Sequence, residues 1–387
     1  MSVRKRTWKG PGGKPKEAWV VDYVDQDGDR CLKTFAKKRD ADAHHAIVGV
    51  AVRAGVHTAD GKSVTIARAV ELWLGSCEAA GLERATMVGY RQHAALHITP
   101  ILGALRLSQL TVPLVRGFED RLRQEGRSPT MVRNVRRSLG GILADAQERG
   151  LVAQNVVYSL RKYRHARRAD GNGKLKIGIN IPAPAEMRAI IGKLDTAGRY
   201  RVLLLTAIFT GLRASELRGL PWTDVDLKRG EIHVRQRADR YGKIGRPKSE
   251  AGTRTVPLPP MLLAALREHR LASPRSELGL VFPNIRGSIE HRNAIVERGF
   301  HPVQIAAGIV DQHGSAKYKG LHSLRHFYAS WCINRRVDGG LELPLKLVQS
   351  RLGHASIQMT ADTYGHLFPC GDDGSELAAA EKAFLAG

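Results

Sequence analysis

The sequence predicts an α+β protein that is mainly α-helical and carries small β-sheets. Three observations support this class. Apolar residues recur at helical spacing through most of residues 61–179. Residues 18–36 instead alternate or run apolar around an Asp-Gly turn signal, which is typical of a β-hairpin. Two further β-like segments, 231–239 and 253–259, lie in a third region whose pattern is otherwise helical.

Composition excludes several classes of protein. The 387 residues include 61 Lys and Arg against 37 Asp and Glu, and the formal net charge is +24. A bias of this size favours a polyanionic partner such as nucleic acid. No apolar run approaches the roughly 20 residues that a membrane span needs, and the first residues lack a signal-peptide core. The sequence contains no phosphate-binding loop and no dinucleotide fingerprint, so we expect no cofactor.

The cysteines indicate a reducing compartment. They are far apart and form neither a CxxC pair nor a metal-ligand spacing, at Cys31, Cys77, Cys332 and Cys370. We therefore expect free thiols, no bound metal and a location in the reducing cytoplasm.

The first region, residues 1–60, opens with a basic arm rich in Gly and Pro and continues with the hairpin pattern. Residues 37–55 then show helical spacing that stops at Gly55. The residues expected on the buried side of this helix are Ala41, Ile47, Val48 and Ala51. A small sheet with one helix is the prediction, and a short solvated module that only holds the N-terminus is the alternative.

The second region, residues 63–165, is helical in pattern and strongly basic. Ser128 followed by Pro129 is a helix-start signal, and the next turns place three arginines at i, i+3 and i+4 on one face. A charged stripe is usually a solvated helix face, but the uncompensated charge here favours contact with the DNA backbone. The residues predicted to contact DNA are Arg133, Arg136, Arg137 and, from an earlier helix, Arg91.

The remaining chain divides into three parts. Residues 166–180 are basic, contain Gly and are weakly periodic, which predicts a linker. Residues 181–370 mix helical patterns with two β segments joined by a turn rich in Gly and Pro. Residues 371–387 are expected to form a short amphipathic helix that docks on a neighbouring molecule.

Two segments of the third region place a cation beside a group that can orient it or transfer protons. In TGLRASEL, Arg213 follows the end of an apolar helix, and Glu216 lies three residues later, where it can orient the guanidinium. In LHSLRH, His322 and Arg325 share a helix face. His326 lies at i+4 from His322, but the zinc pattern HExxH lacks its Glu here, so His326 is expected to be a structural histidine.

A third segment, RLGHASIQMTADTYGHLF, supplies His354 and Tyr364. Because Thr363 and Gly365 flank the tyrosine, we expect an accessible hydroxyl. Taken alone, an exposed tyrosine is commonplace. Two arginines, two histidines and a tyrosine together suit attack on a DNA phosphodiester. The cations and donors would neutralise the extra negative charge of the phosphorane-like state, and the phenol would supply the nucleophile.

These segments together resemble the tyrosine recombinase (phage-type integrase) family, over nearly the whole chain and most densely in residues 200–370. The family's TGLRxxEL, HxxR, LGH and TxxxYxH boxes occur here in order. The catalytic residues that the resemblance implies are Arg213, Lys248, His322, Arg325, His354 and Tyr364, with Glu216 in support. Lys248 lies in a KS segment before RTVPL, and Lys243 is its rival for the role of the catalytic lysine.

The resemblance implies three domains: an arm-type DNA-binding module (1–60), a helical core-binding domain (63–165) and a catalytic domain (181–370). It implies a site-specific recombinase that cuts and rejoins DNA through a 3′-phosphotyrosyl intermediate and a Holliday junction, without metal or cofactor. The expected partners are double-stranded attachment-site DNA, a homotetramer on that DNA, and accessory DNA-bending or excision factors. The arm-type module favours the integrase of a phage or other mobile element.

Three alternatives stay open. A Xer-type chromosome resolution recombinase and a type IB topoisomerase-like enzyme use similar residues, and a DNA-binding protein could carry the set without catalysis. Two segments depart from the family pattern. Residues 337–343 lengthen the gap between Arg325 and His354, and residues 283–320 are also long. Both are expected to be loops.

Overall fold

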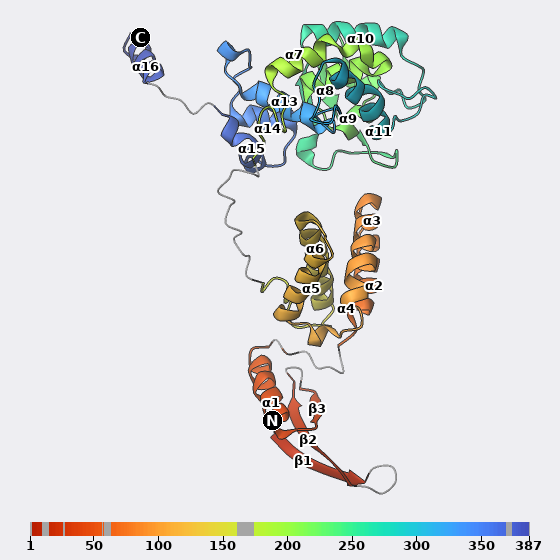
Figure 1. The fold of residues 1–387 in the computed structure, drawn as a ribbon, viewed down its shortest axis with the longest axis vertical. Helices are drawn as coiled ribbons and strands as arrows, with labels where there is room; N and C mark the ends of the chain where they lie inside the picture. Colours follow the sequence, from red (N-terminus) through yellow and green to blue (C-terminus); the bar gives the residue numbers. More distant parts are fainter. Residues whose placement is uncertain are drawn as a thin grey trace. The chain divides into compact units, whose positions relative to one another are not determined.

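The computed structural model describes residues 2–9, 15–25, 28–55, 57, 63–160, 174–368 and 374–386. Helices predominate, and the strands form two three-stranded sheets and one two-stranded hairpin, all antiparallel (Figure 1). The predicted class, mainly α with small sheets, is confirmed. Buried apolar residues form three separate clusters along the chain, and each is described by itself below. No helix in the described part is long and apolar enough to span a membrane.

The N-terminal module is one sheet with one helix. Its elements are β1 (Ser2–Lys9), β2 (Pro15–Val24), β3 (Arg30–Phe35) and α1 (Lys38–Arg53). Val21 and Tyr23 of the central strand pack against Ala41 and Val48 of α1. The prediction that Ile47 lies on the buried side is wrong, because its side chain is 69% exposed. A three-stranded sheet is narrow, so it covers only the single stripe of α1 that runs through Ala41 and Val48.

The second group of elements is entirely helical. They are α2 (Ile66–Ala79), α3 (Arg84–His93), a π-helical segment (Ala94–Ile98), α4 (Thr99–Leu102), α5 (Val112–Gln124) and α6 (Pro129–Glu148). Trp73, Phe118 and Leu139 are among the buried residues of their common core. The side chain of Ser128 accepts a hydrogen bond from Met131 N, so α6 begins where the Ser-Pro signal predicts.

The third group contains α8 (Arg201–Thr210), whose residues are almost all buried. The other helices are α7 (Pro184–Gly192), α9 (Ala214–Arg218), α10 (Pro260–Ala272), α11 (Arg292–Ile295), α12 (His301–Ala306), α13 (His322–Ile333), α14 (Leu345–Leu352), α15 (Ile357–Tyr364) and α16 (Ser375–Leu385). The strands are β4 (Val225–Asp226), β5 (Glu231–Val234), β6 (Arg237–Ala238), β7 (Ile244–Gly245) and β8 (Arg254–Pro257). The two predicted β segments meet in the β4-β5-β8 sheet, where Ile232 pairs with Val256 and both are fully buried.

Two segments are expected to be loops, and for residues 283–320 this prediction is wrong. They contain α11, a π-helical segment (Val296–Phe300) and α12, and Phe300 is fully buried. The segment is folded because its apolar side chains are buried in the core, where they are removed from water. Residues 337–343 are mixed: Val337 is exposed, whereas Leu341 and Leu343 pack against the core.

The predicted linker is described only from residue 174 onward, because residues 161–173 lie outside the described part. Leu175, near the start of this described part, contacts the third group of elements. The Leu175 side chain packs on its core, and the Leu175 carbonyl accepts a hydrogen bond from His366 Nε2 at 2.6 Å.

Candidate active site

The site begins where α8 ends. Gly211 has a φ of +61°, and a Cβ there would lie 2.4 Å from the Tyr328 ring, so this turn requires glycine. Arg213 then precedes the first residue of α9. Its backbone N–H donates to Glu216 Oε2 (2.8 Å), and its Nη1 donates to Oε1 (2.7 Å). Glu216 therefore caps α9 and orients the guanidinium with the same carboxylate.

A second arginine, which sequence reasoning missed, holds the other side of Glu216. Arg254 in β8 donates from Nη2 to Oε2 (2.8 Å) and from Nη1 to Oε1 (3.2 Å). The two side chains are 4% and 2% exposed. Burial alone would raise the pKa of Glu216, but Arg254 and Arg213 lower it to about 2. The carboxylate is therefore ionised at neutral pH and binds both arginines as an anion.

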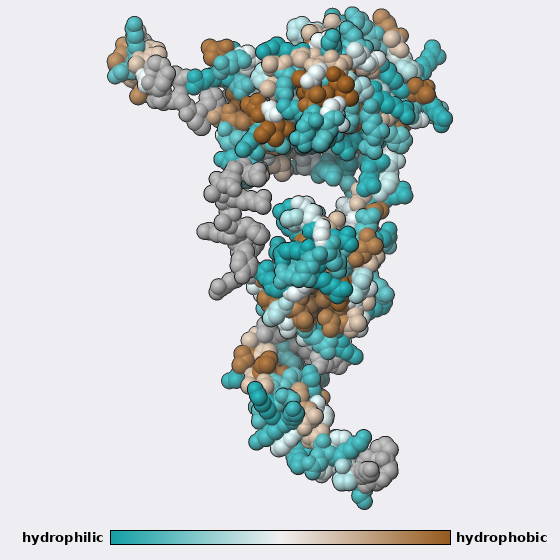
Figure 2. Space-filling model, in the orientation of Figure 1, coloured by the Kyte–Doolittle hydropathy of each residue, from teal (hydrophilic) through white to brown (hydrophobic). Residues whose placement is uncertain are grey.

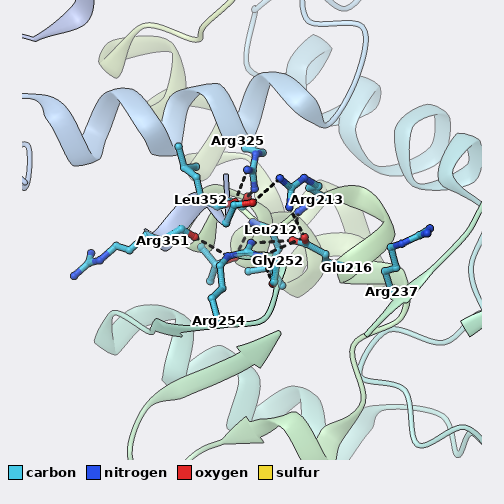
Figure 3. A network of polar contacts seen from close by, with 12 residues as sticks. Leu212, Arg213, Glu216, Arg237, Gly252, Arg254, Arg325, Arg351 and Leu352 are labelled. Atoms are coloured by element: carbon cyan, nitrogen blue, oxygen red, sulfur yellow. Dashed lines mark hydrogen bonds and ion pairs between the residues drawn. The ribbon is translucent and has the colours of Figure 1, made fainter. Parts of the chain in front are cut away.

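Three arginines converge on the C-terminal end of α14 (Figure 3). Three consecutive carbonyls each accept a hydrogen bond from a different guanidinium. The pairs are Arg254 Nε to Arg351 O (2.8 Å), Arg325 Nη2 to Leu352 O (2.5 Å) and Arg213 Nη2 to Gly353 O (3.0 Å). Carbonyls at a helix end lack intrahelical partners and carry the negative end of the helix dipole. This helix end therefore fixes three cations from three separate segments.

Gly353 allows this approach and positions the next residue. Its φ is +63°, and a Cβ would lie 2.9 Å from Arg254 Nη1. His354 follows, 7% exposed, with Nδ1 hydrogen-bonded to Thr360 Oγ1 at 2.9 Å. Burial, then Arg325, Arg213 and Arg254, lower the pKa of His354 to about 4. His354 is therefore neutral at pH 7.

Arg325 of α13 is the most enclosed cation of the site, at 2% exposure. Its Nη1 donates to Gly211 O at 2.7 Å, in addition to the bond from Nη2 to Leu352 O. Burial and the nearby Arg213 lower the pKa of Arg325 to about 9, which still leaves it charged at neutral pH. A guanidinium has five N–H donors, so further donors remain for an oxyanion.

Tyr364 is the last residue of α15, and the prediction that its hydroxyl is accessible is wrong. The side chain is 1% exposed, because α15 directs it inward between the polar residues that flank it. Its ring is stacked parallel to His354, with 6.2 Å between centroids, and its Oη hydrogen-bonds with His326 Nδ1 at 2.7 Å. Burial raises the pKa of Tyr364 to about 12, against the opposite effect of Arg325 and Arg213.

The two histidines of α13 occupy different places. His326, predicted to be a structural histidine, contacts the Tyr364 oxygen directly. His322 packs edge-on against His326, with 4.5 Å between ring centroids. Partial desolvation, followed by Arg325, Arg213 and Arg292, lowers the pKa of His322, although its side chain still reaches solvent. Nothing in the sequence spacing relates His326 to a tyrosine 38 residues later, which is why the contact was missed.

The structure brings together five of the six predicted catalytic residues, and Lys248 is the exception. Lys248 is exposed in the segment between β7 and the 3₁₀ turn Glu250–Gly252. Within the described part of the chain, no hydrogen bond or ion pair joins its side chain to another residue. Lys243, its rival, is also exposed, and its backbone N–H donates to Asp239 Oδ1 at 2.8 Å.

The four arginines predicted to contact DNA differ in their partners. Arg133 and Arg137 are exposed, and neither forms an ion pair with any described carboxylate. Arg136 donates from Nη1 to the buried Glu119 at 3.1 Å, and Arg91 forms an ion pair with Glu78.

Comparison with known proteins places this site in a family. Residues 183–369 match the sequence model described as the phage integrase family. The tyrosine recombinase XerC-like protein of Caldanaerobacter subterraneus subsp. tengcongensis is 26% identical over 374 residues, which cover 89% of this chain and 90% of the relative. The chain belongs to the tyrosine recombinase family. The ICEBs1 integrase of Bacillus subtilis is 23% identical to this recombinase over 318 residues, 80% of each chain.

A solved structure shares the fold of this recombinase. The Tn1549 transposon integrase, in complex with a circular intermediate DNA, superposes with a TM-score of 0.65 at 18% identity. The match covers 83% of this recombinase and 100% of that chain.

Proposed function

We propose that this tyrosine recombinase is the integrase of a phage or other mobile element, which cuts and rejoins DNA at specific sites through a covalent phosphotyrosine. One observation carries the proposal: the Tyr364 phenol lies among Arg213, Arg325 and His354 at the end of α14. The net charge of +24 suits a DNA substrate. The ICEBs1 integrase, similar over 80% of this chain, supports the assignment to a mobile element. We place its action in the bacterial cytoplasm, at the nucleoid.

In the proposed reaction, Tyr364 Oη attacks the scissile phosphorus. The bond from phosphorus to the 5′-oxygen breaks, which leaves a 3′-phosphotyrosyl link and a free 5′-hydroxyl. Arg213, Arg325 and His354 bind the non-bridging oxygens, whose negative charge grows in the transition state. Because carbonyls and Glu216 already hold the guanidiniums, little reorganisation is needed. Loss of one such donor is expected to slow cleavage by about 10²–10³-fold.

Lys248 is proposed to protonate the leaving 5′-oxygen, and His322 to assist proton transfer at the tyrosine. Both side chains reach solvent, where DNA would approach them. Lys248→Ala should slow cleavage while DNA binding persists, and Lys243→Ala is the matched control. Normal cleavage by Lys248→Ala, with loss in Lys243→Ala, would move the role to Lys243.

Rejoining is proposed to occur when the 5′-hydroxyl of a partner strand attacks the phosphotyrosine. Two such rounds pass through a Holliday junction, with four protomers on two DNA sites. Accessory DNA-bending or excision factors would set the direction of the reaction.

We propose that α16 joins neighbouring protomers. Its apolar side chains are exposed, at Leu377 (65%), Phe384 (84%) and Leu385 (74%). An apolar pocket lies between α7, α8 and α13, and brown surface gathers over this region in Figure 2. Its lining includes Met187, Ile191, Phe209, Phe327 and Trp331. Occupation of this pocket by α16 of a neighbour would bury both surfaces. Deletion of residues 375–387 should reduce assembly on DNA while a single protomer still binds it.

The test of the proposed function is a covalent adduct. The protein is incubated with supercoiled plasmid, denatured, and examined for DNA attached to protein. Wild type should form the adduct and Tyr364→Phe should not; an adduct in the variant would refute the assignment. A non-catalytic DNA-binding protein would form none.

Sequencing the junctions between the chromosome and the DNA that carries this gene tests the biological role. An integrase predicts duplicated core sequences at both junctions. A Xer-type recombinase predicts none and should resolve chromosome dimers instead. A type IB topoisomerase-like enzyme would relax plasmids without such sites.

A further inference from the structure

We propose that His326 is a further catalytic residue, which takes the proton from Tyr364 Oη as this oxygen attacks phosphorus. The inference rests on the proposed function, because it requires Tyr364 to be the nucleophile. Its basis is the hydrogen bond of 2.7 Å between Tyr364 Oη and His326 Nδ1. No other hydrogen bond of the phenol oxygen is found among the residues that the structure describes.

Both partners are held by rigid elements. His326 lies in the first turns of α13, directly after Arg325, whose guanidinium donates to Gly211 O and Leu352 O. Tyr364 ends α15, and its ring lies against His354. The group that takes the proton and the cation that binds the phosphate are therefore adjacent on one helix. Because they are adjacent, the helix positions both groups for the same phosphate: His326 to remove the proton and Arg325 to stabilise the negative charge.

The protonation states match the role. Burial, His322 and Arg325 lower the pKa of His326 to about 4, so the ring is neutral at pH 7 and Nδ1 can accept a hydrogen bond. The pKa of Tyr364 is raised to about 12, so the phenol keeps its proton until attack. The groups that face the pair are His322 and Arg325 on α13, Arg213 before α9 and His354 after α14. A bound DNA phosphate adds negative charge, which favours the imidazolium only when substrate is present.

The other two histidines are worse placed to accept this proton. His322 contacts the His326 ring, and no described hydrogen bond links it to Tyr364. The His354 ring lies parallel to the tyrosine ring with 6.2 Å between centroids, no described hydrogen bond joins it to Tyr364, and its Nδ1 is bonded to Thr360. His326 is the histidine whose ring nitrogen meets the phenol oxygen.

The step balances as a phosphoryl transfer. The Oη–H bond breaks as the Oη–P bond forms, and the proton moves to His326 Nδ1. The bond from phosphorus to the 5′-oxygen breaks, and that oxygen receives a proton from Lys248 in the proposed mechanism. Rejoining reverses the order, and His326 returns its proton to the phenol.

The test compares His326→Asn with wild type. Asparagine can hydrogen-bond near the position of Nδ1 but cannot take up a proton. The substrate is a duplex copied from the attachment site, and single-turnover adduct formation is measured at saturating protein. We expect cleavage to slow by at least about 100-fold with DNA affinity unchanged. The matched control is His269→Asn on α10, where Nε2 hydrogen-bonds with Val281 O, and its cleavage rate should equal that of wild type.

A substrate with sulfur at the 5′-bridging position distinguishes a defect in activating the nucleophile from a defect in protonating the leaving group. When sulfur replaces the 5′-bridging oxygen, the leaving group departs without a proton. The defect of His326→Asn should persist on this substrate, whereas the defect of Lys248→Ala should shrink. Rescue of His326→Asn by sulfur, or its cleavage of the oxygen substrate at the wild-type rate, would overturn the proposal.

Two controls keep the outcome decisive. If His326→Asn does not fold, His326→Gln replaces it in the same assays with the same expectations. Tyr364→Phe runs in parallel. An adduct in Tyr364→Phe would refute the proposed function itself. No adduct in Tyr364→Phe, combined with wild-type cleavage by the His326 variant, would remove only the role of His326.

Discussion

Two buried glutamates, each bound by arginines, lie in different regions of this recombinase. Glu216 belongs to the catalytic site and pairs with Arg213 and Arg254, the latter only 4% exposed. Glu119, on α5 of the helical region, is 1% exposed. Its partners stay between 28% and 48% exposed, at Arg116, Arg123 and Arg136. The residue types are the same, but the two sets of cations differ in their surroundings.

The difference lies in what else the arginines bind. Arg136 links α6 to Glu119 on α5, so this cluster joins two helices with cations that keep much of their hydration. Arg213 and Arg254 bind Glu216 and, in addition, donate to carbonyls at the end of α14. A carboxylate that only joins helices contributes stability. A carboxylate that also orients guanidiniums contributes preorganised positive charge. Such charge is usually the largest single contribution to the stabilisation of a transition state.

The largest expected effect comes from breaking the ion pair in the catalytic region. Arg254→Met leaves the buried Glu216 with Arg213 as its remaining cation, and we expect a loss of about 3–5 kcal/mol in the free energy of unfolding. Cleavage should fall by at least about 100-fold, because Glu216, which orients Arg213, loses the two hydrogen bonds from Arg254 that hold it in place. Urea unfolding and single-turnover cleavage at saturating DNA measure the two effects.

A double variant separates the two contributions of this pair. Arg254→Met combined with Glu216→Leu removes both charges, so much of the lost stability should return. Cleavage should stay low, since the carboxylate that orients Arg213 is gone. If stability and cleavage recover together, the pair is structural only, and the contrast with Glu119 fails.

Acid should weaken the catalytic region through its histidines. The pKa of His354 is lowered from 6.5 to about 4 in the folded protein, so the unfolded chain binds more protons between these values. The free energy of unfolding therefore falls as pH drops from 6.5 toward 4, and His326 acts in the same direction. Glu216, whose pKa is about 2, extends the loss from pH 4.5 downward.

The pH effect is checked by the midpoint of thermal unfolding in wild type and His354→Gln. The variant should show a shallower decline between pH 6.5 and 4, because one of the titrating groups is gone. Parallel curves would mean that His354 is not held neutral by the site.

In the helical region, Glu119→Gln is expected to cost about 1–3 kcal/mol of unfolding free energy, because a buried charge-assisted network becomes neutral. The cleavage rate at saturating DNA should equal that of wild type. Circular dichroism during thermal unfolding and the adduct assay measure the two quantities. A slower cleavage rate at saturating DNA would show that this cluster also positions catalytic groups.

Local sequence signals accounted for the parts of the structure that local forces decide. The Ser128 cap, the turn at Gly211 and the Arg213–Glu216 contact each depend on residues within a few positions of one another. Arg254 could not be found in this way, because its partners Glu216 and Arg351 lie 38 and 97 residues away. Such contacts arise from tertiary packing alone.

Tyr364 shows how a local reading fails. Its neighbours Thr363 and Gly365 indicate an exposed segment, yet a helix can direct one side chain inward while its neighbours face solvent. The contact with His326 then follows from the packing of α15 beside α13. Lys248 is the converse case. The motif predicts a role for it, but its side chain is exposed, and no described hydrogen bond or ion pair joins it to the other five residues.

The smallest expected effects concern the exposed arginines of α6, and they distinguish cations that bind carboxylates from cations left for DNA. Arg133→Ala and Arg137→Ala should each weaken DNA binding several-fold, and each lost phosphate contact should reduce the salt dependence by about 0.9 in log–log slope. Arg136→Ala should instead lower stability, because it removes a partner of the buried Glu119. Affinity measured by fluorescence anisotropy at several salt concentrations, with thermal unfolding alongside, tests this division. Arg136→Ala could instead change the salt dependence of DNA binding as much as Arg133→Ala does. Arg136 would then bind the buried glutamate and DNA at the same time, and an ion pair with a carboxylate would not predict which arginines of this recombinase leave DNA unbound.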